Sequence, residues 1–386
     1  MKLDPNQTAR NLVLLAVFLP VFIAIIYLLQ TVLDARHYDF AAYWQASRMT
    51  LDGQNVYDSS TWLAMRQKYQ TALHSEDVFQ YPLPLAVLLI PLGKLPVQTA
   101  YFIWMFFSLV ALLLTFLLLL SFYPQRSVFF EVMLVAGLFL FRPVYSALIG
   151  GQILALLLFC LAFSTLLFAR EKWFLGGGML AFLALKPSLG LPFLVLSGTW
   201  LLKEKRWRAL IGMVLADTGL LLLGMAFNAD WVAEYFVGGS GLAAKYYGLQ
   251  TTLWGLGGML LKTRWGGLLI GAVLSIFVLT LSGQALLRQG QPIAPFAAMA
   301  TLVPAALLVA PYSWSYDQIL LLLPLIFLLI QIANRFGDWA AAFFLVFVSA
   351  FAAGLFFIAN ALGHDVWSVT ISGLVFAGAI YFLRKR

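Results

Sequence analysis

Apolar residues follow one another along this chain in long, nearly uninterrupted runs. Many runs reach about 18 residues, which as a helix rising about 1.5 Å per residue can cross a hydrocarbon core of roughly 30 Å. We therefore expect an all-α polytopic membrane protein, in which residues 1–386 form a single integral membrane domain of about 10–12 transmembrane helices. The long runs lie near Leu12–Leu33, Val97–Phe122, Val128–Phe141, Ile153–Phe168, Ala209–Phe227, Gly266–Leu287, Ile293–Ala310, Gln318–Ile332, Ala340–Ala359 and Val366–Leu383.

Residues 173–202 have a different pattern, because positive clusters flank them on both sides and Lys186-Pro187 lies at their centre. A single span would place one of the two clusters outside the cell. Two short helices that meet at Lys186-Pro187 would return both clusters to the same side. The preference for positively charged cytoplasmic loops therefore predicts a pair of short helices broken at this dipeptide.

The composition excludes a soluble protein, since 62% of the residues are hydrophobic and 10% are charged, against about 45–50% and about 25% in soluble domains. The net charge of +8 could suggest an anionic partner. Most Lys and Arg residues, however, fall on the side that the span pattern assigns to the cytoplasm. The charge thus predicts orientation in the cell membrane, with both termini cytoplasmic, and gives no indication of nucleic-acid binding.

Residues 34–82 form the longest polar segment and follow the first span, so we expect an extracytoplasmic loop with juxtamembrane helices. Aromatic residues beginning at Phe40 recur there at helical spacing, and Ser60 is placed to cap a second helix. Two amphipathic helices with aromatic faces suit the membrane interface. Packing of the same faces as a lid on the helical bundle is an equally good interpretation.

Asp39 is the first candidate for chemistry, since it lies just beyond the first span at the start of an aromatic-rich helix. A carboxylate in this position can cap the helix. In a dry environment it can instead act as a general base and accept a proton from an attacking hydroxyl group.

Lys186 is the second candidate, because an ammonium group between two apolar half-helices needs an anionic partner. Pro187 suits the first turn of a helix, so Ser188 and Leu189 could direct backbone amides at the same anion. A cation beside a helix N-terminus is typical of a phosphate site. The alternative is a buried ion pair with one of three acids, Asp39, Asp217 or Asp317.

Other polar groups collect in the remaining non-cytoplasmic turns. Gln152 follows two glycines and could bond a sugar hydroxyl or a phosphate, although close helix packing also explains Gly150-Gly151. Trp314 and its tyrosine neighbours could stack on a sugar ring, or could form part of an aromatic belt at the interface. Asp217, within a span, and His364 receive no role.

The one-sided distribution of these residues indicates chemistry at the outer membrane boundary on a lipid-borne substrate. The sequence contains no group of His, Cys and carboxylate residues at metal-ligand spacing and no phosphate-binding glycine motif. We therefore expect no metal and no cofactor.

Several short motifs follow one another along the chain. They are Asp39-Phe40 with Tyr43, residues 51–58 (LDGQNVYD), residues 79–84 (FQYPLP), residues 91–96 (PLGKLP), Gly151-Gln152, Leu185-Lys186-Pro187, and Pro311 to Trp314. Taken together in this order, they resemble glycosyltransferase family 87, the polyprenol-phosphate-mannose-dependent mannosyltransferases of the GT-C superfamily. Val56 and Tyr316-Asp317 depart from the family's pattern, which often has Pro and His at these points.

The resemblance implies a GT-C-like bundle that transfers a sugar, usually mannose, with inversion from a polyprenyl phosphate to an extracytoplasmic glycolipid, glycan or protein acceptor. Asp39 matches the family's catalytic base. The donor phosphate would contact Lys186, Ser188 and Gln152, and the sugar or acceptor would contact Tyr43, Trp44, Tyr81, Trp314, Tyr316 and Asp317. The alternatives are a GT-C enzyme with another polyprenyl-phosphate sugar, a flippase or transporter of a lipid-linked saccharide, and a non-catalytic scaffold.

Overall fold

The computed structural model describes residues 24, 32–71, 78–239, 245–261, 263–287 and 292–384, and the regular elements in these ranges are all helices. Six of the described helices are long and apolar enough to cross a membrane, or seven if the bent pair Val128–Gly137 and Arg142–Ile149 is one span. Three further apolar helices are shorter, at 10–17 residues. This confirms the all-α polytopic class, and nearly all of the predicted first span, Leu12–Leu33, lies outside the described residues.

The chain divides into two compact units. The first unit contains residues 1–117, 147–159 and 215–242, and the second contains 118–146, 160–214 and 243–386. Four helices have residues in both units, because the division falls within them: α6 (Val97–Leu120), α8 (Arg142–Ile149), α9 (Leu154–Ala169) and α12 (Trp207–Met225).

In the first unit, α2 (Phe40–Leu51) is buried on almost every side, because α4 (Leu83–Leu88) and α5 (Ile90–Gly93) pack against it. Its aromatic residues therefore form core contacts within the unit. The other described elements here are η1 (Ala35–His37), α3 (Ser59–Tyr69), α13 (Trp231–Glu234) and the π-helical turn η3 (Tyr235–Gly239).

The cap of α3 is Asp58, two residues before the predicted Ser60. The Asp58 carboxylate accepts hydrogen bonds from the Thr61 backbone N–H and hydroxyl and from the Ser60 hydroxyl. These bonds, Thr61 first, lower the pKa of Asp58 to about 2. A carboxylate is the stronger acceptor here because it also interacts favourably with the positive end of the helix dipole.

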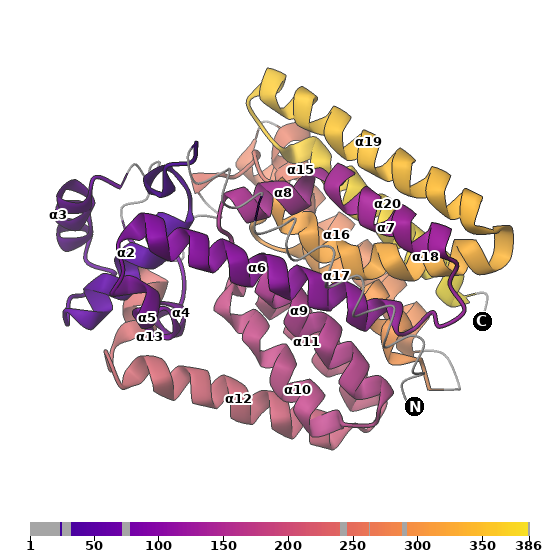
Figure 1. Cartoon of the computed structure of the whole chain (residues 1–386), viewed down its shortest axis with the longest axis horizontal. Coiled ribbons are helices and arrows are strands. Elements are labelled where there is room, and N and C mark those ends of the chain that lie inside the picture. Colours follow the sequence, from indigo (N-terminus) through magenta and orange to yellow (C-terminus); the bar gives the residue numbers. More distant parts are fainter. Residues whose placement is uncertain are drawn as a thin grey trace. The chain divides into compact units, whose positions relative to one another are not determined.

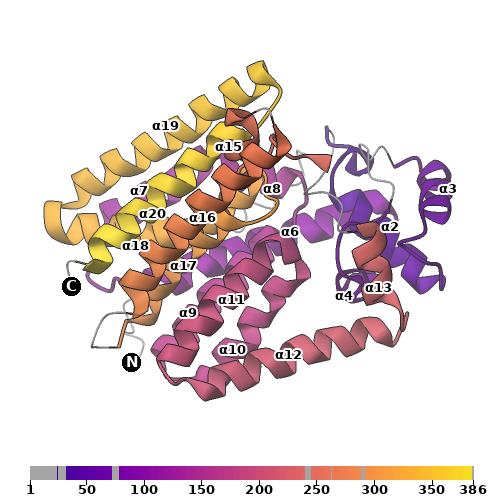
Figure 2. The same ribbon diagram turned by 180° about the vertical axis from the view of Figure 1, so that it is seen from behind.

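The second unit is built around α17 (Pro295–Val309), whose residues are buried along almost its whole length. α11, α16, α18 and α20 all pack against it (Figures 1 and 2). The described elements of this unit are α7 (Val128–Leu140), α10 (Trp173–Ala181), η2 (Phe182–Leu185), α11 (Pro187–Lys203), α15 (Leu253–Leu260), α16 (Arg264–Leu287), α17, η4 (Ser315–Leu321), α18 (Leu322–Phe336), α19 (Asp338–Leu362), η5 (Val366–Ser368) and α20 (Val369–Arg384).

A break between η2 and α11 falls at Lys186, whose backbone leaves the helical region at φ −128° and ψ 79°. Pro187 follows at the first helical position, where its missing N–H leaves no hydrogen bond unmade. A Cβ on Gly190 would lie 1.9 Å from the Leu183 carbonyl oxygen, so only glycine allows α11 to fold back this closely onto η2.

Two glycines allow α10 and α12 to approach each other within backbone contact. A Cβ on Gly177 would lie 1.9 Å from the carbonyl oxygen of Ala209, and one on Gly212 would lie 2.0 Å from that of Phe174. Small residues at a helix interface are a common means of association inside membranes, where close packing replaces the hydrophobic effect as the driving force.

We expect Gly177→Ala to lower the free energy of unfolding by about 1–3 kcal/mol, because the added methyl group forces the two backbones apart. Thermal unfolding of the purified protein in detergent measures the change. The matched control is Gly219→Ala on α12, where an added Cβ meets no atom within 4 Å. A Gly177→Ala variant as stable as the Gly219→Ala variant would contradict the close approach.

Candidate functional site

The N-terminus of α2 docks against the turn at Gly150-Gly151-Gln152 in the first unit. The Phe40 backbone N–H donates to the Gly150 carbonyl oxygen at 3.1 Å. Asp39 precedes this helix with φ −58° and ψ −25°, and its side chain makes no capping hydrogen bond. The capping role that the sequence left open for Asp39 is therefore absent, and its carboxylate is directed elsewhere.

The Asp39 carboxylate accepts a hydrogen bond from the side-chain amide of Gln152 through Oδ2. The other end of this amide, Oε1, accepts a hydrogen bond from the Tyr43 hydroxyl at 3.0 Å. Gln152 and Tyr43 are fully buried, whereas Asp39 is half-buried. Because the tyrosine donates to one end of the amide, the other end presents its N–H group to the carboxylate.

Gly151 makes this arrangement possible, with φ +64° and no room for a side chain. A Cβ there would lie 2.6 Å from Cβ of Phe40. Two side chains of α6 hold the same turn, since the Trp104 indole N–H donates to the Gly151 carbonyl at 2.7 Å and the Tyr101 hydroxyl donates to the Ile149 carbonyl at 2.5 Å. Gly151 thus allows the close packing that the sequence left open as an explanation for the glycine pair.

Tyr43 also contacts Tyr81, whose ring meets it edge-on at 4.9 Å between centroids. The Tyr57 hydroxyl donates to the Tyr81 backbone carbonyl at 2.7 Å, and burial raises the pKa of Tyr57, which keeps this donor protonated. Trp44 lies apart from this group. Its indole N–H donates to the Leu95 carbonyl at 2.9 Å, and its ring packs on a tyrosine of α3.

The second unit contains a buried ion pair between Lys186 Nζ and Asp317 Oδ1, at 2.5 Å. Lys186 is 3% exposed and Asp317 is 0% exposed. The Lys186 ammonium also lies 5.0 Å from the centre of the Tyr316 ring. Of the three acids that the sequence offered as partners for Lys186, the structure therefore selects Asp317.

The first turn of α11 differs from the predicted anion site. The backbone N–H groups of Leu189 and Gly190 both donate to the Lys186 carbonyl oxygen, at 3.1 and 2.8 Å. The expectation that the Leu189 amide is directed at a phosphate is therefore wrong, because this helix begins with an ordinary turn that uses the amide internally. Ser188 is half-buried in the same turn.

The segment before η4 is held by hydrogen bonds from several directions. Asp317 Oδ2 accepts the Trp314 backbone N–H at 2.8 Å, and the Trp314 indole N–H donates to the Tyr312 hydroxyl. The Trp314 ring meets Tyr246 edge-on at 5.6 Å. Tyr246, Tyr312 and Trp314 form one cluster beside the ion pair. We call these three residues, together with Lys186 and Asp317, the Lys186 cluster.

Sequence reasoning missed three members of this surrounding structure. Arg142 Nη1 donates to the Ser315 hydroxyl at 2.6 Å, and the Ser315 backbone N–H donates to Asp365 Oδ2 at 2.8 Å. Tyr246 comes from the long connection before α15. Arg142 and Asp365 were visible as polar residues in turns that the sequence assigns to the non-cytoplasmic side, but the sequence contained no signal that pairs them with Ser315.

The predicted site residues thus form two groups, each within its own unit. Asp39, Tyr43, Tyr81 and Gln152 come together in the first unit, and Lys186, Trp314, Tyr316 and Asp317 come together in the second. Asp217 lies within α12, and its buried Oδ1 has no hydrogen-bond partner among the described residues. In the described part of the chain no three His, Cys, Asp or Glu side chains gather as metal ligands would.

Comparison with known proteins gives a family match. The model of glycosyltransferase family 87 matches residues 79–311, which is more than half of the chain. The matched range includes Tyr81, Gln152 and Lys186, and it begins after Asp39 and Tyr43. No curated protein and no solved structure matches the chain.

We expect Lys186→Met to lower the free energy of unfolding by about 3–5 kcal/mol, because it leaves the Asp317 carboxylate buried without its cation. Lys186→Met combined with Asp317→Asn should recover most of this loss, since the new amide is neutral and still accepts the Trp314 N–H. Denaturant unfolding in detergent measures both variants.

The matched control is Lys203→Met, which removes a more exposed ion pair with Glu204, 2.8 Å long. Its expected cost is below about 1 kcal/mol. If the Lys186→Met single variant and the double variant unfold at the same denaturant concentration, the pair does not stabilise the second unit.

Proposed function

We propose, because the chain belongs to glycosyltransferase family 87, that it transfers mannose from a polyprenyl-phosphate carrier to an acceptor outside the cytoplasmic membrane. Membership of the family makes the chain a membrane glycosyltransferase, which needs a sugar donor, an acceptor and a bilayer. The acceptor is a glycolipid, a glycan or a protein. Donor and acceptor are the only reactants, and no cofactor takes part.

The observation that carries the proposal is the contact of Asp39 with Gln152 and, through it, with Tyr43. The amide N–H holds the carboxylate in a defined orientation. A general base must lie within hydrogen-bond reach of the proton that it takes, so a fixed orientation of the carboxylate is what this role needs. Its half-buried position at the start of α2 also leaves it partly accessible to a hydroxyl group.

Asp317, the buried carboxylate of the Lys186 cluster, is less suited to act as the base. One of its oxygens pairs with the Lys186 ammonium and the other accepts the Trp314 N–H. Its side chain is also fully buried, so it is enclosed by protein groups. We assign the Lys186 cluster the role of positioning the Trp314 loop, and Asp39 the role of the base.

The proposed reaction is a single displacement. Asp39 takes the proton of the acceptor hydroxyl as the hydroxyl oxygen attacks the anomeric carbon. The bond between that carbon and the phosphate oxygen breaks, and the polyprenyl phosphate leaves with the electron pair. One displacement inverts the configuration at the anomeric carbon, and the activated phosphate linkage supplies the driving force.

Asp39→Asn should lower the transfer rate about 10²–10⁴-fold, the usual contribution of a general base. Purified protein, radiolabelled polyprenyl-phosphate-mannose and a total lipid and glycan extract provide the assay. The unfolding midpoint and the binding of the carrier lipid should match those of the parent protein. Asp52→Asn is the matched control, since Asp52 is an exposed acid at the other end of α2.

Three outcomes of this assay separate the candidate functions. Label in a new product supports the proposed transferase, whereas label that moves only between the leaflets of a vesicle identifies a flippase. Transfer from a glucose, arabinose or aminoarabinose carrier, but not from the mannose carrier, would show that the proposed sugar is wrong and that the proposed transfer reaction is right. A chelator should leave the rate unchanged, and a rate lost on chelation and restored by a divalent cation would contradict the metal-free mechanism.

Gln152→Met should lower kcat about tenfold or more, because it removes the donor that orients Asp39, and it should change KM for the donor less than about threefold. Tyr43→Phe should have a smaller effect in the same direction, since it frees only the far end of the amide. A raised KM with unchanged kcat would instead assign Gln152 to binding of the donor phosphate, as the sequence first suggested.

A further inference from the structure

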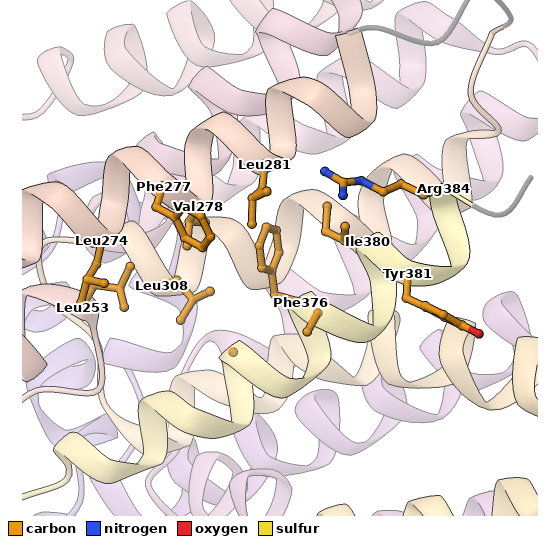
Figure 3. Close-up of a pocket in the computed structure, with 12 residues that line it drawn as sticks. Leu253, Leu274, Phe277, Val278, Leu281, Leu308, Phe376, Ile380, Tyr381 and Arg384 are labelled. Atoms are coloured by element: carbon orange, nitrogen blue, oxygen red, sulfur yellow. The ribbon is translucent and has the colours of Figure 1, made fainter.

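A groove of about 650 Å³ lies in the second unit between α16 and α20, with α17 and the start of α15 beneath it (Figure 3). This volume is within the range of about 300–1,000 Å³ that is usual for ligand sites. Nearly all of its lining is apolar, including Phe277 and Leu281 on α16 and Phe376 and Ile380 on α20. None of these residues belongs to the Asp39 or Lys186 groups.

The polar residues of the groove are confined to one end. Tyr381 and Arg384 are its polar side chains, and both come from the last turn of α20 (Figure 3). The Arg384 guanidinium donates to Gln284 Oε1 on α16 at 3.4 Å, so it lies across the end of the groove. In the sequence Arg384 is followed by Lys385 and Arg386, which adds positive charge at the same end of the chain.

The length of the groove matches one leaflet of a bilayer. Its lining on α20 extends from Gly373 to Arg384, which at about 1.5 Å per residue corresponds to roughly 16 Å of helix. Half of a hydrocarbon core is about 15 Å thick. A straight acyl chain that follows the groove would therefore end near the middle of the bilayer, and its head group would lie beside Arg384.

The groove opens onto the protein surface, where lining residues on both α16 and α20 are exposed. Phe277 is 58% exposed and Tyr381 is 45% exposed, and only 28% of the apolar window of α16 is buried inside the protein. Arg384 is also exposed, on a helix end where a guanidinium can reach the head-group region. A ligand can thus enter sideways from the bilayer.

We propose that this groove binds one anionic phospholipid, with an acyl chain against α16 and α20 and the head-group phosphate on Arg384. Basic pockets between transmembrane helices bind anionic head groups in this way, and a guanidinium matches the geometry of a phosphate. The site is separate from the proposed transferase chemistry and does not depend on it. Apolar walls alone would not select between lipids, so Arg384 provides the preference for negative charge.

The test compares phosphatidylglycerol with phosphatidylcholine of identical acyl chains, added to the detergent-purified full chain. Native mass spectrometry measures the ratio of the two retained lipids. The parent protein should retain phosphatidylglycerol preferentially, and Arg384→Gln should lower that ratio about fivefold, the effect of one cationic residue near an anionic head group. Ala377→Trp, which fills the exposed side of the groove, should reduce retention of both lipids.

Arg335→Gln is the matched control, because Arg335 is another exposed arginine in the last turn of a helix, α18, and lies outside the groove. The proposal is overturned if Arg335→Gln lowers the ratio as much as Arg384→Gln does, which would indicate general surface charge. It is also overturned if Arg384→Gln leaves the ratio unchanged, or if polyprenyl phosphate displaces phosphatidylglycerol from the parent protein at equal concentration. The lipid measurement uses no sugar transfer, so its failure would leave the proposed reaction untouched.

Discussion

A polar group enclosed by apolar helices must find its partner inside the protein, because the surrounding lipid cannot supply one. Lys186 meets this requirement with Asp317, and Arg126 meets it with Glu131 at 2.6 Å, both pairs being almost fully buried. Gln152 meets it with Asp39 and Tyr43. The Lys186 and Gln152 contacts join residues that are 131, 113 and 109 positions apart, so they fix how distant segments pack within each unit, whereas the Arg126 pair closes a local turn.

The sequence predicted the features that depend on local pattern. Apolar runs gave the helical membrane class, and the helical spacing of aromatic residues beginning at Phe40 predicted the helix that the structure shows as α2. The partners of Gln152 could not be read from the sequence because they lie 113 and 109 residues away. The partner of Lys186 stayed open for the same reason, with three acids available and no local signal to select Asp317.

Two local expectations were wrong, and both concern the first turn of a helix. Asp58 rather than Ser60 caps α3, because the helix begins two residues earlier than expected and a carboxylate can accept several donors at once. The Leu189 amide, expected to face an anion, closes the first turn of α11 on the Lys186 carbonyl. Sequence spacing locates a helix start to within a residue or two. The identity of the capping residue and the hydrogen-bond partner of a given amide both change when the start shifts by a single residue.

The two groups also differ in how far their carboxylates are enclosed, and this difference bears on which one performs chemistry. In the Lys186 cluster the Asp317 carboxylate is fully buried, and both of its oxygens are engaged, one by the Lys186 ammonium and one by the Trp314 N–H. In the Asp39 group the carboxylate is half-buried, and a buried amide that is itself aligned by the Tyr43 hydroxyl donates to it. A carboxylate that is held in a defined orientation and is partly accessible is the better placed of the two to meet a hydroxyl group of a substrate. Gln152 is therefore more than a packing residue: its length and its two-ended amide connect the fold of α2 to the orientation of Asp39.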